Sequence, residues 1–427
     1  MSVPSEVFSE LASTRPRPTA AAALRSAVHA RRMLLVKSLL VKVERQSVAL
    51  APEVRQRFEQ GWAMLERTER ADAAAVRDAV DYPTTGAWLA ELLAAPEGPA
   101  FDWHLAHLGG VAVAAAVRAG CGAGGTLTVP SGVLALPGLG VLRCPSGRVS
   151  LDGDARRVRI TDGAGDNSVV LSRPGPGGGA GPPRLIGVGT GWSGLRMLPS
   201  SPVVLDDLDP YRVPPRGIGP SGLSAADRPH SARELWAERW REANKLLSAT
   251  DAGRAAEIRT VLQAVVPLAA PRQLNGPPVS ATLRSAPGAV LIQLPADARE
   301  LTESLVHETH HTKLAALDEL MPLCRPGEGA LHRVGWRPDP RPVPAVLQGA
   351  YAHLALTDFS WRALNRPVGP VAWRRWAAEQ FETYRNQVGE ALLILRDSDE
   401  LTNVGREFVH QMSRHHAGLG MAARSLA

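Results

Sequence analysis

The segment AVLIQLPADARELTESLVHETHHTKLAALDEL, residues 289–320, joins a short apolar strand to a long helix. Residues 289–294 are nearly all apolar, a pattern typical of a buried strand. A proline ends this strand, and Asp297 and Glu300 then have the spacing of a capping box at the start of a helix. We therefore expect a helix from about residue 297 to Leu320, where another proline follows closely.

Within that helix, residues 307–311 read His-Glu-Thr-His-His and match the HExxH pattern. His307 and His311 are four residues apart, so they share a helix face and can direct two imidazoles at one ion. Glu308 lies beside them, and in a metallopeptidase it would take a proton from metal-bound water. The preceding strand could act as an edge that pairs with an extended peptide. The alternative is a polar helix face without metal, and His310 is assigned no metal role.

A metal ion on this helix needs a third ligand from elsewhere, because residues 314 and 317 are leucines. The candidates downstream are His353, Glu379 and Glu382. His353 ends the apolar segment Gly349-Ala-Tyr-Ala-His353, where a hydrogen-bonded core histidine is the simpler interpretation. The residues alone leave the third ligand open.

The chain has 427 residues, enough for two or three domains, and its apolar and charged fractions, 44% and 21%, are those of a globular protein. Residues 1–120 are predicted to be helical. Residues 121–212 contain short β-branched segments between turn residues and predict a small antiparallel β region. Residues 213–427 form the predicted helical catalytic region, which starts with a linker over 213–229 and includes helices over 231–247 and 252–268. The predicted fold class is α+β, mainly helical, with a zincin-like strand and HExxH helix as its core.

Charge and targeting patterns give further expectations. The formal net charge is +6, but the basic residues are spread along the chain, so we expect no nucleic-acid partner. We see no apolar run approaching about 20 residues and no signal pattern at the N-terminus, which predicts a cytoplasmic protein without a membrane partner. The three cysteines form no CxxC pair and predict free thiols.

Two smaller clusters of polar residues have structural interpretations. The stretch Leu205-Asp-Asp-Leu-Asp-Pro-Tyr-Arg212 contains three carboxylates and predicts a capped turn rather than a metal site. His104 and His107 are predicted to have core or capping roles.

Several segments together resemble a known family. HETHHTKLAAL at 307–317, WRPDPRP at 336–342 and GAYAH at 349–353 are similar to the HExxH-type peptide-modification proteins encoded beside ribosomally made, post-translationally modified peptides. FDWHLAHLG at 101–109 and LTNVGR at 401–406 also resemble that family, so the similarity covers most of the chain. The family implies an iron(II)- and 2-oxoglutarate-dependent peptide β-hydroxylase built on a peptidase-like helix.

The resemblance implies His307, His311 and His353 as iron ligands. Three histidines would differ from the two-histidine, one-carboxylate set common in such oxygenases. The co-substrate 2-oxoglutarate is a dicarboxylate, whose far end calls for an arginine. Arg341 is the first candidate and Arg337 the second, and the alternative for both is a solvated basic turn.

Two further residues have roles that depend on the chemistry. Tyr351 could donate a hydrogen bond to the co-substrate, or could lie buried in the core. Glu308 would contact the substrate or support the ligands in an oxygenase, instead of activating water.

The predicted function is thus a dioxygenase that β-hydroxylates a residue of a ribosomally synthesised precursor peptide, its expected partner. The first alternative is a zinc metallopeptidase, in which a glutamate completes the zinc site and Glu308 is the base. The second alternative is a non-catalytic peptide-binding protein that retains a vestigial site.

Overall fold

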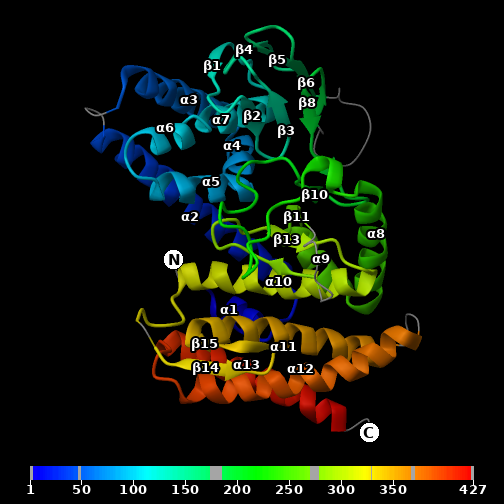
Figure 1. The fold of residues 1–427 in the computed structure, drawn as a ribbon. Helices are drawn as coiled ribbons and strands as arrows, with labels where there is room; N and C mark the ends of the chain where they lie inside the picture. Colours follow the sequence, from blue (N-terminus) through cyan, green and yellow to red (C-terminus); the bar gives the residue numbers. More distant parts are fainter. Residues whose placement is uncertain are drawn as a thin grey trace.

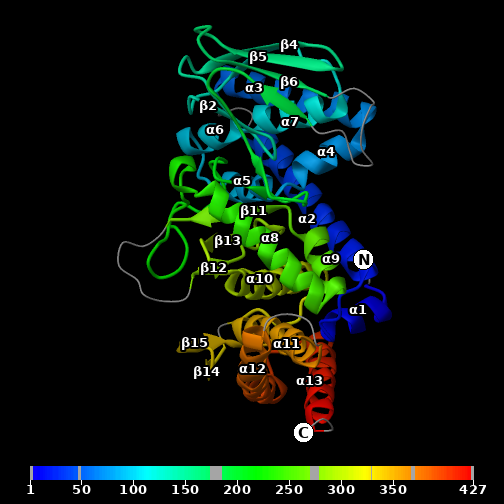
Figure 2. The same cartoon turned by 90° about the vertical axis from the view of Figure 1, so that its right-hand side faces the viewer.

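A computed structural model describes residues 3–46, 50–173, 185–269, 278–327, 329–366 and 371–424 of the chain. The molecule is elongated: helices and the antiparallel strands of residues 125–172 lie at one end, the C-terminal helices lie at the other, and a smaller sheet lies between them, as Figures 1 and 2 show. The α+β class expected from the sequence is confirmed.

The N-terminal region is helical through residue 119, as predicted. Proline stands in the first turn of four of these helices, where its missing N–H costs no hydrogen bond. Gly120 ends the last one in the left-handed conformation, with φ of 67°. The helices are α1 (Ser5–Ala12), α2 (Pro18–Arg45), α3 (Pro52–Ala71), α4 (Ala73–Val80), α5 (Pro83–Ala94), α6 (Pro99–Leu105) and α7 (Leu108–Ala119).

One stretch of this region, Pro99–Ala119, is long and apolar enough to cross a membrane, and the sequence reasoning overlooked it. However, 61% of that window is buried inside the fold, and a core helix of a folded protein passes the same test. The stretch is therefore only weak support for a membrane span.

The predicted antiparallel β region is present and forms two sheets that pack with α7 around a shared apolar core. The larger sheet has the order β1-β4-β5-β6-β7 and the smaller has the order β2-β3-β8, with antiparallel neighbours throughout. The strands are β1 (Gly125–Thr128), β2 (Val133–Leu136), β3 (Gly140–Arg143), β4 (Arg148–Gly153), β5 (Arg157–Asp162), β6 (Ser168–Ser172), β7 (Ile186–Val188) and β8 (Trp192–Gly194).

A third, mixed sheet lies above the HExxH helix, in the order β12-β13-β11-β10-β9. The predicted domain boundary at residue 212 does not separate two sheets, because two strands from before it pair with three strands from after it. β10, β11 and β13 are parallel, and the two outer pairings are antiparallel. The strands are β9 (Arg196–Met197), β10 (Val204–Leu205), β11 (Ala264–Leu268), β12 (Ser280–Ala281) and β13 (Ala289–Gln293).

Three expectations fail around this sheet. The helix predicted over 252–268 ends earlier, as α9 (Ala252–Val261), and β11 follows it because its apolar residues are buried on both faces of the sheet. The strand before the HExxH helix, β13, is internal, and β12 forms the edge of the described sheet. The predicted linker 213–229 is packed, since Ile218 and Leu223 are buried in a core cluster.

The C-terminal region is helical, as predicted, with a hairpin inserted before α11. The HExxH helix α10 lies between the mixed sheet and the C-terminal helices (Figure 1). The remaining elements are η1 (Arg228–His230), α8 (Arg233–Thr250), α10 (Ala298–Leu320), β14 (Leu331–Val334), β15 (Arg337–Pro342), α11 (Val343–Asn365), α12 (Val371–Asp397) and α13 (Asn403–Arg424).

The start of α10 follows the predicted capping pattern. The Asp297 carboxylate accepts a hydrogen bond of 2.9 Å from the backbone N–H of Glu300. The Glu300 carboxylate accepts one of 2.8 Å from the backbone N–H of Ala296, one residue before the position that a standard capping box uses. These bonds fix the first turn, and with it the phase of the histidines further along the helix.

Candidate functional site

Three histidines from two helices meet in one cleft. His307 and His311 come from α10, and their Nε2 atoms are 2.9 Å apart. His353 comes from α11, and its ring centroid lies 5.2 Å from that of His307. All three line a cleft of about 1090 Å³. The structure therefore brings together the three residues that the sequence reasoning singled out as metal ligands.

Two of the imidazoles are oriented through their Nδ1 atoms. His311 Nδ1 lies 3.2 Å from the side-chain oxygen of Gln348, and His353 Nδ1 lies 2.9 Å from the carbonyl oxygen of Gly349. An Nδ1–H that donates to these oxygens leaves Nε2 as a lone-pair donor. Histidines that ligate metals are commonly held in this way.

Burial keeps two of the three imidazoles uncharged. It lowers the pKa of His307 well below its usual value and that of His353 to about 4. Neutral imidazole is the form that binds a metal ion, so neither residue must lose a proton at neutral pH.

The donor set fits a metal ion in its chemistry, although the three rings are not arranged around a single point. Two nitrogens that are each about 2.1 Å from a metal are about 3 Å apart at a right angle, close to the separation of the His307 and His311 Nε2 atoms. Over the described residues, no group of three or more His, Cys, Asp or Glu side chains has the geometry of a finished site. The His353 ring stacks on Trp336, with the two ring centroids 4.5 Å apart.

Glu308 lies in the same cleft beneath the edge strand. The Ser280 hydroxyl on β12 donates a hydrogen bond of 2.7 Å to its Oε1 atom. Thr282, which follows β12, also donates a hydrogen bond to this carboxyl, and the Oε2 atom is buried. Burial raises the pKa of this carboxyl, which favours the protonated form.

Two cleft residues escaped the sequence reasoning. Glu303 lies one turn before His307 on the same face of α10, and the Tyr384 hydroxyl of α12 donates a hydrogen bond to it. The Tyr384 ring is 5.5 Å from the His353 ring. The spacing of residues 303, 307 and 311 could have revealed Glu303, whereas no local pattern marks Tyr384.

The glutamates considered as third ligands lie elsewhere. Glu379 and Glu382 on α12 are both 61% exposed and pair with arginines of the same helix. Neither of them lines the cleft. Their prediction as ligands is wrong, because the face of α12 that carries them points to solvent.

Both candidate arginines line the cleft from β15. Asp339 lies between them and is paired with Arg337 and with Arg341, each at 3.1 Å. Both side chains are partly exposed, so either could reorient toward a ligand. The alternative prediction for both arginines is a solvated basic turn. Their partial exposure agrees with it, but it does not explain why both line the cleft.

The proposed role of Tyr351 at the co-substrate is wrong, and its alternative, burial in the core, is confirmed. The side chain is fully buried and its hydroxyl donates a hydrogen bond of 2.8 Å to the carbonyl of Leu11. Tyr351 is two residues from His353, or about 200° around the helix, and so faces the opposite side.

No model of a known protein family matches this chain, and no curated protein does.

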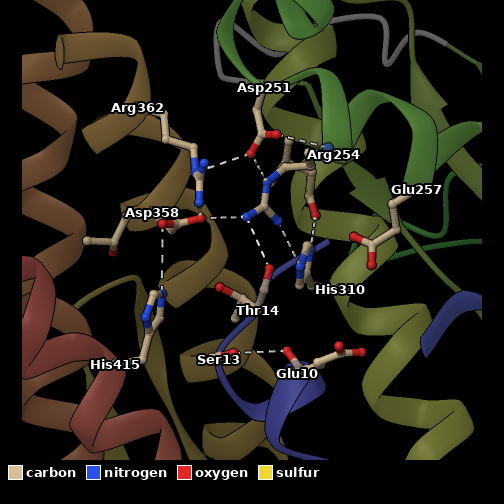
Figure 3. Close-up of polar contacts among 12 residues, drawn as sticks. Glu10, Ser13, Thr14, Asp251, Arg254, Glu257, His310, Asp358, Arg362 and His415 are labelled. Atoms are coloured by element: carbon tan, nitrogen blue, oxygen red, sulfur yellow. Dashed lines mark hydrogen bonds and ion pairs between the residues drawn. The ribbon is translucent and has the colours of Figure 1, made fainter. Parts of the chain in front are cut away.

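A buried polar network stands behind the histidines and joins three helices (Figure 3). Arg254 of α9 donates hydrogen bonds to His310 of α10 at 3.0 Å and to Asp358 of α11 at 2.8 Å. Nδ1 of His310 bonds the carbonyl of Val306 at 2.8 Å. His310 thus belongs to this network rather than to the cleft, and Arg254 joins α10, which carries His307 and His311, to α11, which carries His353.

The acidic stretch 205–212 forms the predicted capped turn. The Asp206 carboxylate accepts hydrogen bonds from the backbone N–H of Asp209 at 3.0 Å and from the Tyr82 hydroxyl at 2.7 Å. The Thr84 hydroxyl donates one of 2.8 Å to Asp209. These contacts attach the turn to α5 and its N-cap. They give Asp206 and Asp209 structural roles as hydrogen-bond acceptors.

The two early histidines also have structural roles. His104 Nδ1 lies 2.9 Å from the Tyr211 hydroxyl, and the His107 ring packs between Trp88 and Tyr211. Burial lowers the pKa of His107 to about 3, so it is a neutral core residue. Both residues pack against other aromatic rings, but His104 is only partly buried and the Nε2 atom of His107 has no hydrogen-bond partner among the described residues.

The buried pair Asp206 and Asp209 predicts a pH dependence of stability. Burial raises the pKa of both carboxyls, to about 7 for Asp209, so the folded state holds a proton that the unfolded state releases near pH 4. Stability from this proton is complete below pH 4 and is lost as the pH rises toward 7. We expect Asp209→Asn to flatten the slope of the unfolding free energy between pH 5 and 7, by at most about 1.4 kcal/mol per pH unit.

Urea unfolding at several pH values measures that slope. Asp154→Asn is the control, since this exposed carboxyl has a lowered pKa and does not titrate in that window. Equal slopes for wild type and Asp209→Asn would contradict the expectation.

Proposed function

We propose that this chain is an iron(II)- and 2-oxoglutarate-dependent oxygenase that hydroxylates a β-carbon in a ribosomally synthesised precursor peptide, on a zincin-like strand and helix core. One observation carries the proposal: the cleft gathers His307, His311 and His353, while Glu379 and Glu382, the glutamates considered as zinc ligands, do not line it. Glu303 is in the cleft, but the Tyr384 hydroxyl occupies one of its oxygens.

Iron bound by the imidazoles would supply the oxygen activation and hydrogen abstraction that the side chains cannot. The protein would bind and orient the reactants. Arg341 or Arg337 would hold the far carboxylate of 2-oxoglutarate through a paired hydrogen bond, in exchange for Asp339. Trp336 and Tyr384 flank His353 and would exclude water from that side of the cleft.

The edge strand supports a peptide as substrate. β12 and the residues beside it, Pro278 to Arg284, line the cleft within the described part of the sheet. A free strand edge binds an extended peptide through main-chain hydrogen bonds. A peptide laid along β12 would pass close to Glu308, which Ser280 of that strand contacts.

The direct test uses protein loaded anaerobically with iron(II) and then mixed with oxygen, 2-oxoglutarate and the precursor peptide. We expect succinate in equal amount to a peptide heavier by one oxygen atom. The matched control is the same protein loaded with zinc. If the iron form produces no succinate with its peptide, the proposal is wrong.

Arg341→Ala tests the assignment of the co-substrate site. The variant loses the charge-assisted contact to the far carboxylate, so the KM for 2-oxoglutarate should rise by about tenfold or more. In the wild type, Asp339 competes with the co-substrate for this partly exposed arginine. Arg333→Ala on β14 is the control, since that exposed side chain does not line the cleft. An unchanged KM for Arg341→Ala would move the role to Arg337.

A zinc metallopeptidase is the second candidate, and the position of Glu308 in the cleft beside the two histidines of the HExxH motif favours it. A carboxylate placed there would take a proton from metal-bound water, as a general base must. Glu308→Gln separates the two functions: it should abolish peptide cleavage by a peptidase, by a factor of about 100 or more. In the oxygenase it should leave succinate formation within about tenfold of wild type.

The remaining alternative, a non-catalytic peptide-binding protein, predicts that the folded protein takes up neither metal. Metal analysis after anaerobic loading and desalting decides this, since an empty site in folded protein would support it.

A further inference from the structure

A second hollow, of about 480 Å³, lies against α11 and α13 and shares no lining residue with the histidine cleft. We propose that it binds a small oxyanion with two or more negative charges, such as a phosphate or a polycarboxylate. Its lining contains four arginines from three parts of the chain: Arg15 after α1, Arg362 and Arg366 of α11 and its C-cap, and Arg414 of α13.

The charges beneath this hollow are already balanced. Asp358 accepts hydrogen bonds from Arg254 at 2.8 Å and from Arg362 at 3.1 Å. Asp251 pairs with the same two arginines, at 3.6 and 3.3 Å. Two carboxylates and two guanidiniums, one of them the 34% exposed side chain of Arg362, therefore balance each other (Figure 3). Asp358 is the only acidic residue in the lining, and its charge is already balanced by Arg254 and Arg362, so it does not neutralise the other arginines of the lining.

The arginines at the mouth are not balanced. Arg15, Arg366 and Arg414 are exposed, and no ion pair joins any of them to another described residue. Glu10, the acid on the neighbouring helix, faces Arg17 at 3.9 Å and accepts a hydrogen bond of 3.0 Å from Thr19. The next residues after Arg366, 367–370, are Pro-Val-Gly-Pro and contribute no acid. Three like charges thus converge at one hollow.

His415 adds a buried polar atom at the same place. Its Nε2 atom is buried without a hydrogen-bond partner among the described residues, and it lies 3.8 Å from Asp358 Oδ1. The side chain is 9% exposed and lines the hollow. A polar atom left unsatisfied at this depth is costly unless a ligand or water meets it.

Guanidinium groups present paired N–H donors that match two oxygens of a phosphate or carboxylate. A multivalent oxyanion here would relieve the repulsion among the three arginines and bridge the N-terminal segment to α11 and α13. We therefore expect it to stabilise the folded protein. This inference does not depend on the proposed oxygenase function, because the hollow is separate from the cleft.

The experiment titrates metal-free protein with orthophosphate, and in a second arm with citrate, by calorimetry and thermal unfolding in buffer free of other multivalent anions. We expect saturable binding of at least one probe and a rise in Tm. The double variant Arg366→Ala/Arg414→Ala should weaken that binding by at least about tenfold. The arm that binds more tightly identifies the phosphate or the carboxylate source.

The control is Arg374→Ala/Arg375→Ala on α12, which removes the same charge from an exposed face outside the hollow. It should bind like wild type. Arg15→Ala, on a separate element, is a second test variant and should also weaken binding. No saturable binding of either probe, or equal weakening in the control, would overturn the proposal.

Discussion

Replacing His353 by alanine should lower the affinity of the folded protein for iron(II) by more than about 100-fold. This residue is the one imidazole that α11 contributes to the cleft, and its Nδ1 contact with Gly349 leaves Nε2 available. Even partners that only orient a metal ligand change affinity by about 10- to 100-fold, so loss of a ligand should cost more. Anaerobic titration with iron(II), and with cobalt(II) as a spectroscopic substitute, measures the change.

His230→Ala is the matched control, because this exposed histidine on η1 is not among the residues that line the cleft. Its metal affinity should equal that of wild type. Circular dichroism of His353→Ala separates loss of a ligand from loss of the fold. Tight, stoichiometric binding by folded His353→Ala would show that another residue completes the site, and Glu303→Gln would then be the variant to test.

Replacing Arg254 by methionine should be the most destabilising single change in the network behind the site. Arg254 is fully buried and bonds His310, Asp358 and the carbonyl of Thr14. Removing one partner of a buried ion pair leaves an uncompensated charge and typically costs about 3–5 kcal/mol. Urea unfolding of the metal-free protein measures the loss.

The same substitution should also weaken metal binding, because Arg254 links the helix of His307 and His311 to the helix of His353. Arg254→Lys keeps the charge but not the paired geometry, and should recover part of the stability. Arg362→Met is the comparison, since that side chain is 34% exposed and makes the outer contact to Asp358. A loss below about 1 kcal/mol for Arg254→Met would contradict the role assigned to this network.

Much of the local structure follows from the sequence. The strand at 289–293, the cap at Asp297 and the helix to Leu320 are where the pattern places them. The i, i+4 spacing puts His307 and His311 on one face whatever surrounds the helix. The same helix periodicity also predicts that Glu303 lies on the face of His307 and His311, and that Tyr351 points away from the face of His353.

Other features depend on partners that are distant in the chain. Residues 264–268 form a strand because β10 and β13 lie on either side of them, and a short apolar run does not show that by itself. β12 displaces β13 from the edge of the sheet in the same way. Glu379 and Glu382 fail as ligands because packing turns their face of α12 to solvent.

The sequence by itself thus determined the HExxH helix, its two aligned imidazoles and the α+β class, because helix periodicity and capping act over a few residues. Only the tertiary structure decided that His353 joins them, that Tyr384 and the β12 edge form the cleft wall, and that Arg254 links the two helices. Those relations join residues tens to hundreds of positions apart, and packing and buried charge pairing select them.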